Sequence, residues 1–354
     1  MKILFFSFAP IHSSVDGVYK SGLRKNNVEI IEYSFHGIHG FLRYSQILQK
    51  YRLHAKEVDY VMVGYDSPLI IIFLWPFCRK KMIYNALCSV YERLIISRNL
   101  ARRVSLKGYY YWLLDFLACR IAWFTMLESR HQIEYFKKMY KLPEKKFYHA
   151  WIGVDEEIFF YQPLVEKNKK YTVLFRGRLL PEAGGCVAVK AAKALEKYPI
   201  HFLMLANGME LGGIQKLIKE LNIKNITLIA EYLSDEKLRL EMQKCHLSLG
   251  QLSSHERLER TIPHKAYESL ALKLPYITAR NPGVMELLSE GETCLTFKPG
   301  NADDLANTIL WAFHHNTTIQ KIAENGYELF MNNLICHKLG EKMLRHLDSL
   351  EKKS

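Results

Sequence analysis

The amino-acid sequence predicts an α/β protein with two parallel-sheet domains, and three observations lead to this prediction. The chain has 354 residues, a length typical of two domains. Apolar residues make up 49% of it and charged residues 24%, so it can bury sizeable cores, which excludes disordered, collagen-like and coiled-coil proteins. Strand-like apolar runs alternate with helical stretches along the whole chain, as in parallel sheets covered by helices.

The first half contains six short runs with the apolar composition of buried strands. The run at 59–64 is apolar almost throughout, as expected of a strand covered on both faces. The stretch 105–119 (SLKGYYYWLLDFLAC) has apolar and aromatic residues at helical spacing and predicts a buried or interfacial helix. The predicted strands are 2–8, 28–33, 59–64, 81–85, 121–127 and 146–150.

The second half repeats this alternation after a polar, proline-containing segment at 160–170, which we interpret as a linker. We therefore place one domain at 1–160, a second at 171–330 and a helical segment at 331–354. Ligands of open α/β sheets bind at the carboxyl ends of strands, so we expect a cleft between the two sheets. The predicted elements are strands at 171–175, 201–205, 226–229, 245–249 and 276–279, and helices at 184–197, 234–244, 264–273 and 318–351.

The positive charge of the chain is concentrated in its first half. Residues 1–150 contain 23 Lys and Arg against 11 Asp and Glu, whereas residues 151–354 contain 26 against 25. The densest stretch, 79–107, has eight basic residues and one acid, Glu92. This asymmetry favours contact with phospholipid, a lipid-linked diphosphate or nucleic acid, the alternative being a solvated basic face.

The sequence shows neither a membrane span nor a cysteine framework. The longest apolar run, 68–78, has 11 residues, well short of the roughly 20 that cross a bilayer. The seven cysteines are dispersed and form no C-x-x-C pair, which favours reduced thiols over disulfides or a zinc site. We expect a cytoplasmic protein, attached peripherally to the inner face of the cell membrane by its basic half.

A glycine-rich turn, FRGRLLPEAGG (175–185), follows the first strand of the second half. Glycine lets the backbone approach a ligand, and the amide groups of the following helix N-terminus favour a phosphate. The turn matches neither G-x-G-x-x-G nor a Walker A sequence. We expect at most one of Arg176 and Arg178 to face the phosphates and favour Arg178; an ordinary strand-to-helix turn with solvated arginines is the alternative.

A second motif, RTIPHKAYESLALKLP (260–275), combines a predicted helix start with charged residues. Pro263 suits the first turn of a helix, and Lys265 and Glu268 then share one helix face. A lysine at a helix N-terminus opposes the helix dipole, and a bound diphosphate would offset it. Glu268 could accept hydrogen bonds from a ribose diol, the alternative being a plain Lys–Glu pair on a surface helix.

Together these motifs resemble those of the group 1 (family 4) glycosyltransferases, and the resemblance covers most of the chain. It implies the GT-B fold, in which two Rossmann-like domains face a central cleft and the carboxyl-terminal helix packs back on the first domain. The stretches that carry it are YNALCSVYE (84–92), LLDFLACRIAW (113–123), WIGVDEEIF (151–159), FRGRLLPEAGG (175–185) and TIPHKAYESLALKLPYITARNPGVMELLSEGE (261–292).

The resemblance implies a role for each motif residue. Arg178 and Lys265 would stabilise the departing diphosphate and are the catalytic candidates, and Glu268 would hold the nucleotide ribose. Asn85 and Glu92 are the candidates on the acceptor side. The remaining donor-binding candidates are Arg176, Gly177 and Gly184 around the phosphate turn, Tyr232 and Leu233 at the base, and Thr261, Ile262, Pro263 and His264 in the loop before the helix.

The sequence departs from the family pattern at three positions. Arg260 stands where the first acid of a Glu-x7-Glu motif would fall, Ala183 replaces a loop lysine, and Asn85 replaces a histidine. Lys265 could substitute for the missing lysine. The sequence also contains no Asp-x-Asp triplet, the motif that would place a divalent ion under the diphosphate. We therefore expect no metal site, and a leaving group neutralised by arginine, lysine and backbone amides.

These observations predict a retaining, metal-independent hexosyltransferase that acts in cell-surface polysaccharide synthesis and needs no cofactor. Its donor would be a nucleotide sugar, with a UDP-sugar favoured over a GDP-sugar, and its acceptor an anionic glycan or lipid-linked sugar. One alternative is a nucleotide-sugar epimerase on the same scaffold. Another is a non-catalytic protein that binds nucleic acid, although no nucleic-acid-binding motif is present and nucleic acid is not an expected partner.

Overall fold

The computed structural model describes residues 1–11 and 14–352 and divides the chain into two compact units. The first comprises Met1–Asp155 with Ile335–Ser354, and the second comprises Glu156–Leu334. The boundary falls a few residues before the segment 160–170 expected as a linker. That segment packs within the second unit, where Lys167 Nζ donates to the carbonyls of Gln243 and Cys245 at 2.8 and 2.7 Å.

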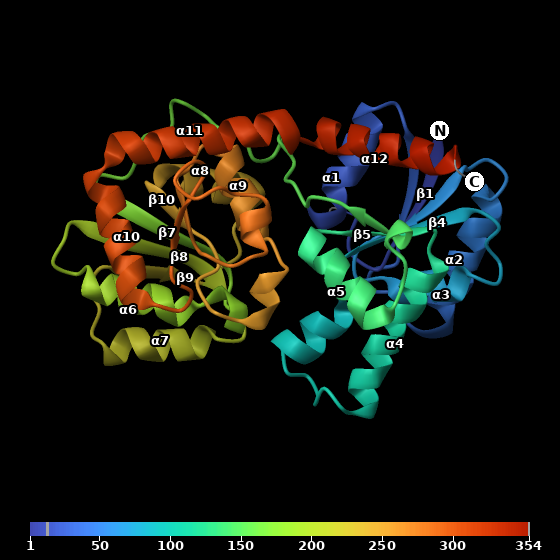
Figure 1. Ribbon diagram of the computed structural model, residues 1–354, viewed down its shortest axis with the longest axis horizontal. Helices are drawn as coiled ribbons and strands as arrows, with labels where there is room; N and C mark the ends of the chain where they lie inside the picture. Colours follow the sequence, from blue (N-terminus) through green and yellow to red (C-terminus); the bar gives the residue numbers. More distant parts are fainter. Residues whose placement is uncertain (12–13, 353–354) are drawn as a thin grey trace. The chain divides into compact units, whose positions relative to one another are not determined.

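The first unit contains a six-stranded parallel sheet with the strand order β2-β1-β3-β4-β5-β6 (Figure 1). Its strands are β1 (Lys2–Ser7), β2 (Glu29–Ser34), β3 (Tyr60–Val63), β4 (Lys81–Leu87), β5 (Phe124–Leu127) and β6 (Phe147–His149). Its helices are α1 (Ser14–Lys25), α2 (Gly40–His54), α3 (Pro68–Leu74), the π-helix η1 (Glu92–Ser97), α4 (Leu106–Ile121), α5 (Arg130–Tyr140), the 3₁₀ helix η2 (Glu144–Lys146) and α12 (Cys336–Glu351).

The alternation of side chains along β1 divides the core of the first unit into two layers. Ile3 and Phe5 pack with α1 and α12 on one face of the sheet. Leu4 and Phe6 pack with α2, α3, α4 and α5 on the other. Because successive strand residues point to opposite faces, a strand that is apolar at every position needs this double cover, as the sequence predicts.

The carboxyl-terminal helix α12 packs against α1 through a glycine contact. A Cβ atom on Gly22 would lie 2.1 Å from the carbonyl oxygen of Cys336, and one on Gly340 would lie 2.4 Å from the backbone of Gly22. The two helix backbones therefore touch at a point where no side chain fits. This confirms the prediction that the carboxyl-terminal helix packs back on the first domain.

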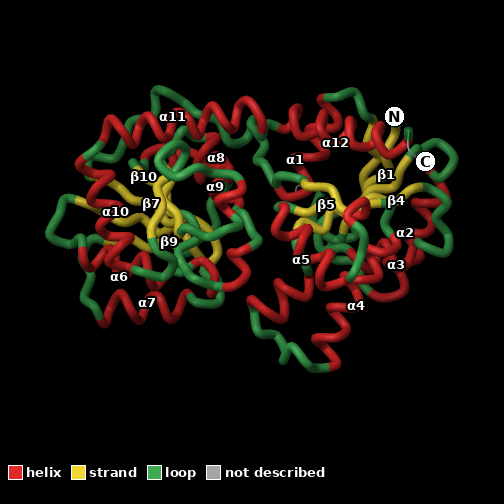
Figure 2. Tube along the Cα trace, in the orientation of Figure 1, coloured by secondary structure: helices red, strands yellow, loops and turns green. Residues whose placement is uncertain are grey.

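The second unit repeats the architecture with the strand order β12-β11-β10-β7-β8-β9, again parallel throughout (Figure 2). Its strands are β7 (Tyr171–Arg178), β8 (Ile200–Asn207), β9 (Ile226–Ile229), β10 (Leu247–Leu249), β11 (Tyr276–Ala279) and β12 (Leu295–Phe297). Its helices are α6 (Gly185–Ala194), α7 (Leu211–Glu220), α8 (Asp235–Lys244), α9 (His264–Ala271), α10 (Ala302–His314) and α11 (Asn316–Asn333), with the 3₁₀ helices η3 (Pro181–Ala183), η4 (Glu256–Glu259) and η5 (Val284–Glu286).

Alternation along β10 places α9 on the face of the second sheet opposite α6, α7 and α10. Leu247 and Leu249 belong to the core formed with those three helices. Ser248 faces the other way and accepts a hydrogen bond from Ser269 of α9 at 2.9 Å. Since α9 begins at His264, this packing holds the second sequence motif at the carboxyl edge of the sheet.

Several helices begin at a residue whose side chain caps the first turn. Ser105, Ser129 and Asn301 accept hydrogen bonds from the backbone amides of Gly108, Gln132 and Asp304 at 3.1, 2.8 and 3.0 Å. Such caps satisfy amide groups that the helix itself leaves unpaired. They fix the start of α4, α5 and α10 locally in the sequence.

The ends of several elements differ from the sequence prediction. Strand β7, predicted at 171–175, continues to Arg178, so Arg176 and Arg178 belong to the strand rather than to the turn after it. Three other elements also differ. The helix predicted at 318–351 is two helices, α11 and α12, because the chain leaves helical geometry at Leu334 and Ile335, where it passes between the units. The strand predicted at 121–127 begins only at Phe124, because α4 continues to Ile121. Strand β12 was not predicted, since its three residues are too short to give a pattern. No helix among the described residues is both long and apolar enough to cross a membrane.

Candidate active site of the second unit

The order of the strands points to one place at which the second sheet can bind a ligand. From β7 the chain proceeds through β8 to the edge strand β9, then returns to β10 on the other side of β7. The loops that leave β7 and β10 therefore diverge at the carboxyl edge of the sheet. Crevices at such reversals are the usual ligand sites of open α/β sheets.

The loop after β7 is held against the loop after β10 by buried polar contacts. Glu182 is buried and pairs with Arg257 at 2.6 Å. Gly184 has a φ of +70°, and a Cβ atom there would lie 2.8 Å from the amide nitrogen of Ser253. Glycine is thus required at this turn, which leads directly into α6. Ala183 is buried, and its carbonyl accepts from the amide of Leu252 at 3.1 Å.

The two arginines of the glycine-rich turn take different directions. Residues two apart in a regular strand share a face, but Gly177 lies between them with a φ of +129°. Arg176 turns to Glu268 and forms an ion pair of 2.9 Å, whereas Arg178 is exposed at the end of β7. The arginine in contact with the second motif is therefore Arg176, and Arg178 remains available to solvent.

Glu268 is the buried centre of the site. Its Oε1 lies 2.9 Å from both a guanidinium nitrogen of Arg176 and Nδ1 of His264, and its side chain is 0% exposed. Burial raises the pKa of Glu268, but Arg176 and His264 outweigh burial and hold it below its usual range. The second oxygen, Oε2, has no hydrogen-bond partner among the residues that the structure describes. An ionised carboxylate with one unused acceptor oxygen suits a hydroxyl-bearing ligand.

Lys265, one residue into α9, is buried beside the glycine-rich turn. Its Nζ donates to the carbonyl of Gly250 at 3.0 Å and lies 4.4 Å from the ring centre of Phe175. Burial, and to a lesser extent the charge of Arg176, lower the pKa of Lys265 to about 7, although Glu268 opposes the shift. The aromatic ring favours the charged form, but burial outweighs it. This amine therefore changes charge near neutrality when no anion is present.

The loop before α9 is packed tightly. Ile262 is buried, and the Thr261 hydroxyl donates to the carbonyl of Arg257 at 3.2 Å. Pro263 is the last extended residue before the helix, with a φ of −70° and a ψ of 138°. Arg260, in the position of the acid that the family resemblance implies, pairs with its neighbour Glu259 at 3.2 Å. This departure therefore adds a cation next to the loop.

The structure places the predicted base-binding turn apart from these residues in the sheet order. Tyr232 is 94% exposed and, with the half-buried Leu233, follows β9. Strand β9 is the sheet edge, and β8 lies between it and β7. The structure thus gathers Arg176, Gly177, His264, Lys265 and Glu268 into one cluster, with Tyr232 and Leu233 outside it.

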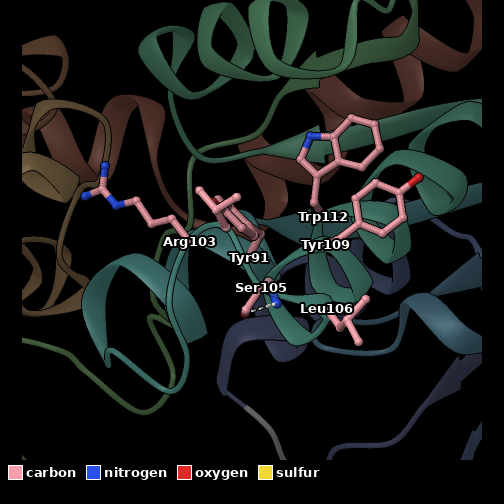
Figure 3. Close-up of a pocket in the computed structure, with 8 residues that line it drawn as sticks. Tyr91, Arg103, Ser105, Leu106, Tyr109 and Trp112 are labelled. Atoms are coloured by element: carbon pink, nitrogen blue, oxygen red, sulfur yellow. Dashed lines mark hydrogen bonds between the residues drawn. The ribbon is translucent and has the colours of Figure 1, made fainter.

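The first unit contains a cavity of about 620 Å³ between η1 and the start of α4 (Figure 3). Its walls include Tyr91, Val104, Leu106, Tyr109 and Trp112, with Arg103 at the side. Apart from Arg103 and Ser105, which caps α4, the lining is apolar or aromatic. None of these residues is a predicted donor-site or acceptor-site residue.

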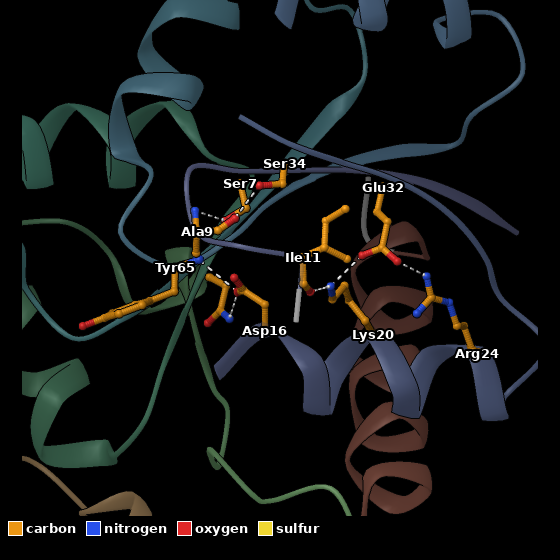
Figure 4. Close-up of polar contacts among 10 residues, drawn as sticks. Ser7, Ala9, Ile11, Asp16, Lys20, Arg24, Glu32, Ser34 and Tyr65 are labelled. Atoms are coloured by element: carbon orange, nitrogen blue, oxygen red, sulfur yellow. Dashed lines mark hydrogen bonds and ion pairs between the residues drawn. The ribbon is translucent and has the colours of Figure 1, made fainter. Parts of the chain in front are cut away.

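Asn85 lies near the carboxyl end of β4 in a buried polar cluster with Asp16 and Tyr65, both of which Figure 4 labels. Its Nδ2 donates to Oδ1 of the buried Asp16 at 3.0 Å, and the amide of Tyr65 donates to the same oxygen at 2.9 Å. Burial raises the pKa of Asp16, although these hydrogen bonds and the charge of Lys20 oppose the shift. One turn along α1, Lys20 forms an ion pair with Glu32 at 2.6 Å.

Glu92, the second acceptor-side candidate, is fully buried. Its Oε2 accepts from Nε2 of Gln132 at 3.0 Å, and its amide donates to Ser89 at 3.0 Å. The neighbouring Asp115 accepts four hydrogen bonds, from Ser89, Tyr140 and two backbone amides, and therefore has a structural role. Burial raises the pKa of Asp115 to about 6. In this structure Glu92 is therefore packed in the interior, and Asn85 and Glu92 lie in separate polar clusters.

Sequence reasoning missed two buried acids that organise these edges, Asp16 and Glu182. Asp16 shares a helix face with Tyr19, Lys20 and Leu23, all of which are buried. An acidic residue within the buried stripe of an amphipathic helix was the available signal. Glu182 gave no such signal in the sequence, because its partner Arg257 lies 75 residues away in another loop.

Residues 157–329 match the family model for glycosyl transferases group 1. The chain contains a group 1 glycosyltransferase domain. A stretch of 144 residues, 39% of the chain, is 27% identical to 2-deoxystreptamine N-acetyl-D-glucosaminyltransferase of Niallia circulans. That match spans 35% of the length of the Niallia enzyme.

Solved structures are similar over the whole length of the chain. Anabaena HepE, solved in complex with UDP-glucose, matches with a TM-score of 0.77 and 15% identity, covering 99% of this chain and 100% of HepE. Sucrose-phosphate synthase of Thermosynechococcus elongatus matches with a TM-score of 0.76 and 14% identity, covering 100% of both chains. At these identities the likeness concerns the fold, and it confirms the predicted GT-B fold. The Arg176–Glu268 cluster lies inside the glycosyltransferase domain.

Proposed function

We propose that this protein transfers a hexosyl group from a nucleoside-diphosphate sugar to a glycan or lipid-linked acceptor in cell-surface polysaccharide synthesis. The observation that carries the proposal is the cluster of Arg176, His264 and Lys265 around the buried Glu268. This cluster lies beside β7, where the strand order of the second sheet reverses, within the group 1 glycosyltransferase domain. Three nitrogen-bearing side chains around one carboxylate suit a ligand that combines hydroxyls with phosphate.

Each residue contributes a separate part of the proposed reaction. A ribose hydroxyl donates to the unused Oε2 of Glu268. The exposed guanidinium of Arg178, the Lys265 amine and the first amides of α6 bind the diphosphate. They stabilise the negative charge that develops on the diphosphate as the bond to the sugar breaks, which is electrostatic stabilisation of a leaving group. These cations supply neutralising charge from the protein itself, which supports metal-independent transfer. Retention at the anomeric carbon belongs to the proposal because the resemblance to the family 4 glycosyltransferases implies it.

The donor base and the acceptor belong to the same proposal. The complexes of HepE with UDP and UDP-glucose support a UDP-sugar, with a GDP-sugar as the alternative. The excess of positive charge in residues 1–150 supports an anionic acceptor and peripheral attachment to anionic lipid. Co-sedimentation with anionic vesicles at low salt measures that attachment, and its absence would remove the membrane part of the proposal.

Nucleotide titration tests the donor site. Isothermal titration of the full chain with UDP, GDP, ADP, CMP and NAD, without added metal, should detect one nucleoside diphosphate. Arg176→Ala, Arg178→Ala and Glu268→Ala should each weaken its binding tenfold or more. The matched control is Arg280→Ala, because Arg280 is an exposed arginine of the same unit, paired with Glu290 on the surface.

A second assay distinguishes transfer from its alternatives. With the nucleotide sugar alone, the protein should release nucleotide only slowly, and a suitable acceptor should accelerate release. Conversion of the donor into an epimeric nucleotide sugar without acceptor would identify an epimerase. If no nucleotide binds, the protein does not use this site as a transferase.

A further inference from the structure

The cavity between η1 and α4 has the size and lining of a site for an apolar molecule. Its volume of about 620 Å³ lies within the range of small-ligand pockets. The rings of Tyr109 and Trp112 are stacked, with centroids 5.6 Å apart and planes inclined by 18°. The rings form one wall of the cavity, and Tyr91 and Leu106 contribute further walls (Figure 3).

The loop that borders the cavity is held by hydrogen bonds within the loop and to η1. Leu100 donates its amide to the carbonyl of Leu94 at 3.0 Å, and Ser105 donates its hydroxyl to the carbonyl of Arg102 at 2.7 Å. A Cβ atom on Gly108 would lie 2.6 Å from the carbonyl oxygen of Arg103, so glycine lets α4 begin directly against this loop. The preceding helix η1 is a π-helix, a rare conformation that is frequent at functional sites.

The rim of the cavity exposes apolar side chains to solvent. Val104 is 99% exposed, Leu106 91% and Tyr109 59%. These three lie within six residues of one another and line the same cavity. A contiguous exposed apolar patch of this kind marks a surface that meets another apolar molecule.

The basic residues around the rim indicate that the apolar molecule in the cavity carries an anionic group. From Arg93 to Leu114 the chain carries five basic residues and no acidic one. Arg102, Arg103 and Lys107 are exposed beside the apolar residues. An apolar cavity with a basic rim is complementary to a molecule with an apolar chain and an anionic head.

We propose that this cavity binds the hydrocarbon chain of a lipid-linked acceptor, and that Arg102, Arg103 and Lys107 bind the acceptor's phosphate or diphosphate. The identification of this lipid as the acceptor rests on the proposed glycosyltransferase function. A buried methylene contributes about 0.8 kcal/mol, so affinity rises about fourfold for each methylene added until the cavity is filled. Longer chains then bind no more tightly.

Soluble alkyl phosphates test this directly. The full chain is titrated with n-alkyl phosphates of increasing length, each below its aggregation concentration, so that no membrane surface is present. The alkyl chains carry a terminal bromine, which quenches tryptophan fluorescence at short range. The chain has five tryptophans, and Trp112→Phe identifies the signal that comes from the cavity.

The decisive variant is Leu106→Asp, because Leu106 lines the cavity and its exposure makes the substitution safe for folding. It should weaken binding of the longer alkyl phosphates at least tenfold. Leu164→Asp is the matched control, since Leu164 is 94% exposed in the second unit and should leave binding unchanged. Replacing Arg102 and Lys107 by glutamine should weaken the binding of alkyl phosphates of every chain length by a similar factor.

Three results would overturn the inference. They are an affinity independent of chain length, quenching that persists in Trp112→Phe, and equal binding by Leu106→Asp and Leu164→Asp. Self-association abolished by Leu106→Asp, without alkyl phosphate binding, would assign the patch to a second copy of the chain instead.

The same samples are titrated with UDP and GDP, which separates this inference from the proposed function. Nucleotide binding without alkyl phosphate binding would overturn the proposed lipid site in the cavity and leave the proposed donor site unaffected. Alkyl phosphate binding without any nucleotide binding supports a lipid site and overturns its role as an acceptor site.

Discussion

The two units share an architecture but carry different chemistry at the same topological position. In each, a parallel six-stranded sheet reverses its strand order next to its first strand, between β1 and β3 in the first unit and between β7 and β10 in the second. At the second reversal, Glu268 pairs with the guanidinium of Arg176 and the imidazole of His264 and keeps one unused oxygen. At the first, Oδ1 of Asp16 accepts from two uncharged donors, the amide of Tyr65 and Nδ2 of Asn85, and Oδ2 also has no hydrogen-bond partner among the described residues. The strand order of each sheet therefore determines where a binding site can lie, and the side chains at that position determine its chemistry.

The largest expected effect concerns the contact between α1 and α12 in the first unit. Gly22→Ala should destabilise the docking of α12 by about 3 kcal/mol, because the new methyl group would overlap the backbone of Cys336. Hydrogen exchange of the α12 amides measures this loss. Gly17→Ala is the control in the same helix, where a Cβ atom would have no neighbour within 4 Å among the described residues, and it should stabilise α1 by up to about 1 kcal/mol. Nucleotide binding in the second unit should survive both.

The next effect tests the charge at the second reversal. Glu268→Gln should destabilise α9 by about 2 kcal/mol at pH 7, because Arg176 and His264 lose a buried counter-charge. The lowered pKa of Glu268 means that its stabilisation is present above the unfolded pKa of about 4.5 and is lost as pH falls through the lower folded pKa. Hydrogen exchange of α9 at pH 7 and in acid should therefore show a difference that shrinks in acid. An equal difference at both pH values would contradict an ionised Glu268.

A smaller effect concerns the Lys265 amine. In the wild type, the folded pKa of about 7 lies below the unfolded value near 10.5, so the unfolded chain binds more protons between these values and stability rises with pH. Lys265→Met should remove this rise. A bound diphosphate favours the charged amine, so wild-type affinity should fall as pH increases above 7, and Lys265→Met should bind about tenfold more weakly at pH 6. Unchanged affinity and turnover in this variant would remove Lys265 from the mechanism.

The smallest effect is expected at the first reversal. Asp16→Asn should change the stability of the first unit by about 1 kcal/mol or less at pH 7, because an amide oxygen still accepts from Tyr65 and Asn85. The raised pKa of Asp16 means that the wild type loses stability as pH rises from the unfolded pKa of about 3.8 through the higher folded pKa. The stability of Asp16→Asn relative to that of the wild type should therefore be higher at pH 7 than at pH 4. Hydrogen exchange of α1 at the two pH values checks the sign, which is opposite to that for Glu268→Gln.

The regular elements could be predicted because their causes lie close together in the sequence. Strands β9 and β11 were predicted to the residue, and the start of α9 follows from Pro263. The buried pairs could not be predicted in the same way. Asn85 meets Asp16 across 69 positions and Glu182 meets Arg257 across 75, and no periodicity connects such residues. The direction of Arg176 depends on the positive φ of Gly177, which a strand pattern does not reveal.

The sequence alone determined the two parallel-sheet domains, the basic first half, and the two motifs that form the candidate active site. It could do so because apolar periodicity, net charge and short motifs are local properties of the chain. Only the tertiary structure decided that Arg176 is the arginine that meets Glu268 and that Glu92 is buried. It alone revealed the cavity beside Trp112, because the shape of the space between Tyr91 and the start of α4 depends on how the intervening loop folds, which no sequence pattern encodes.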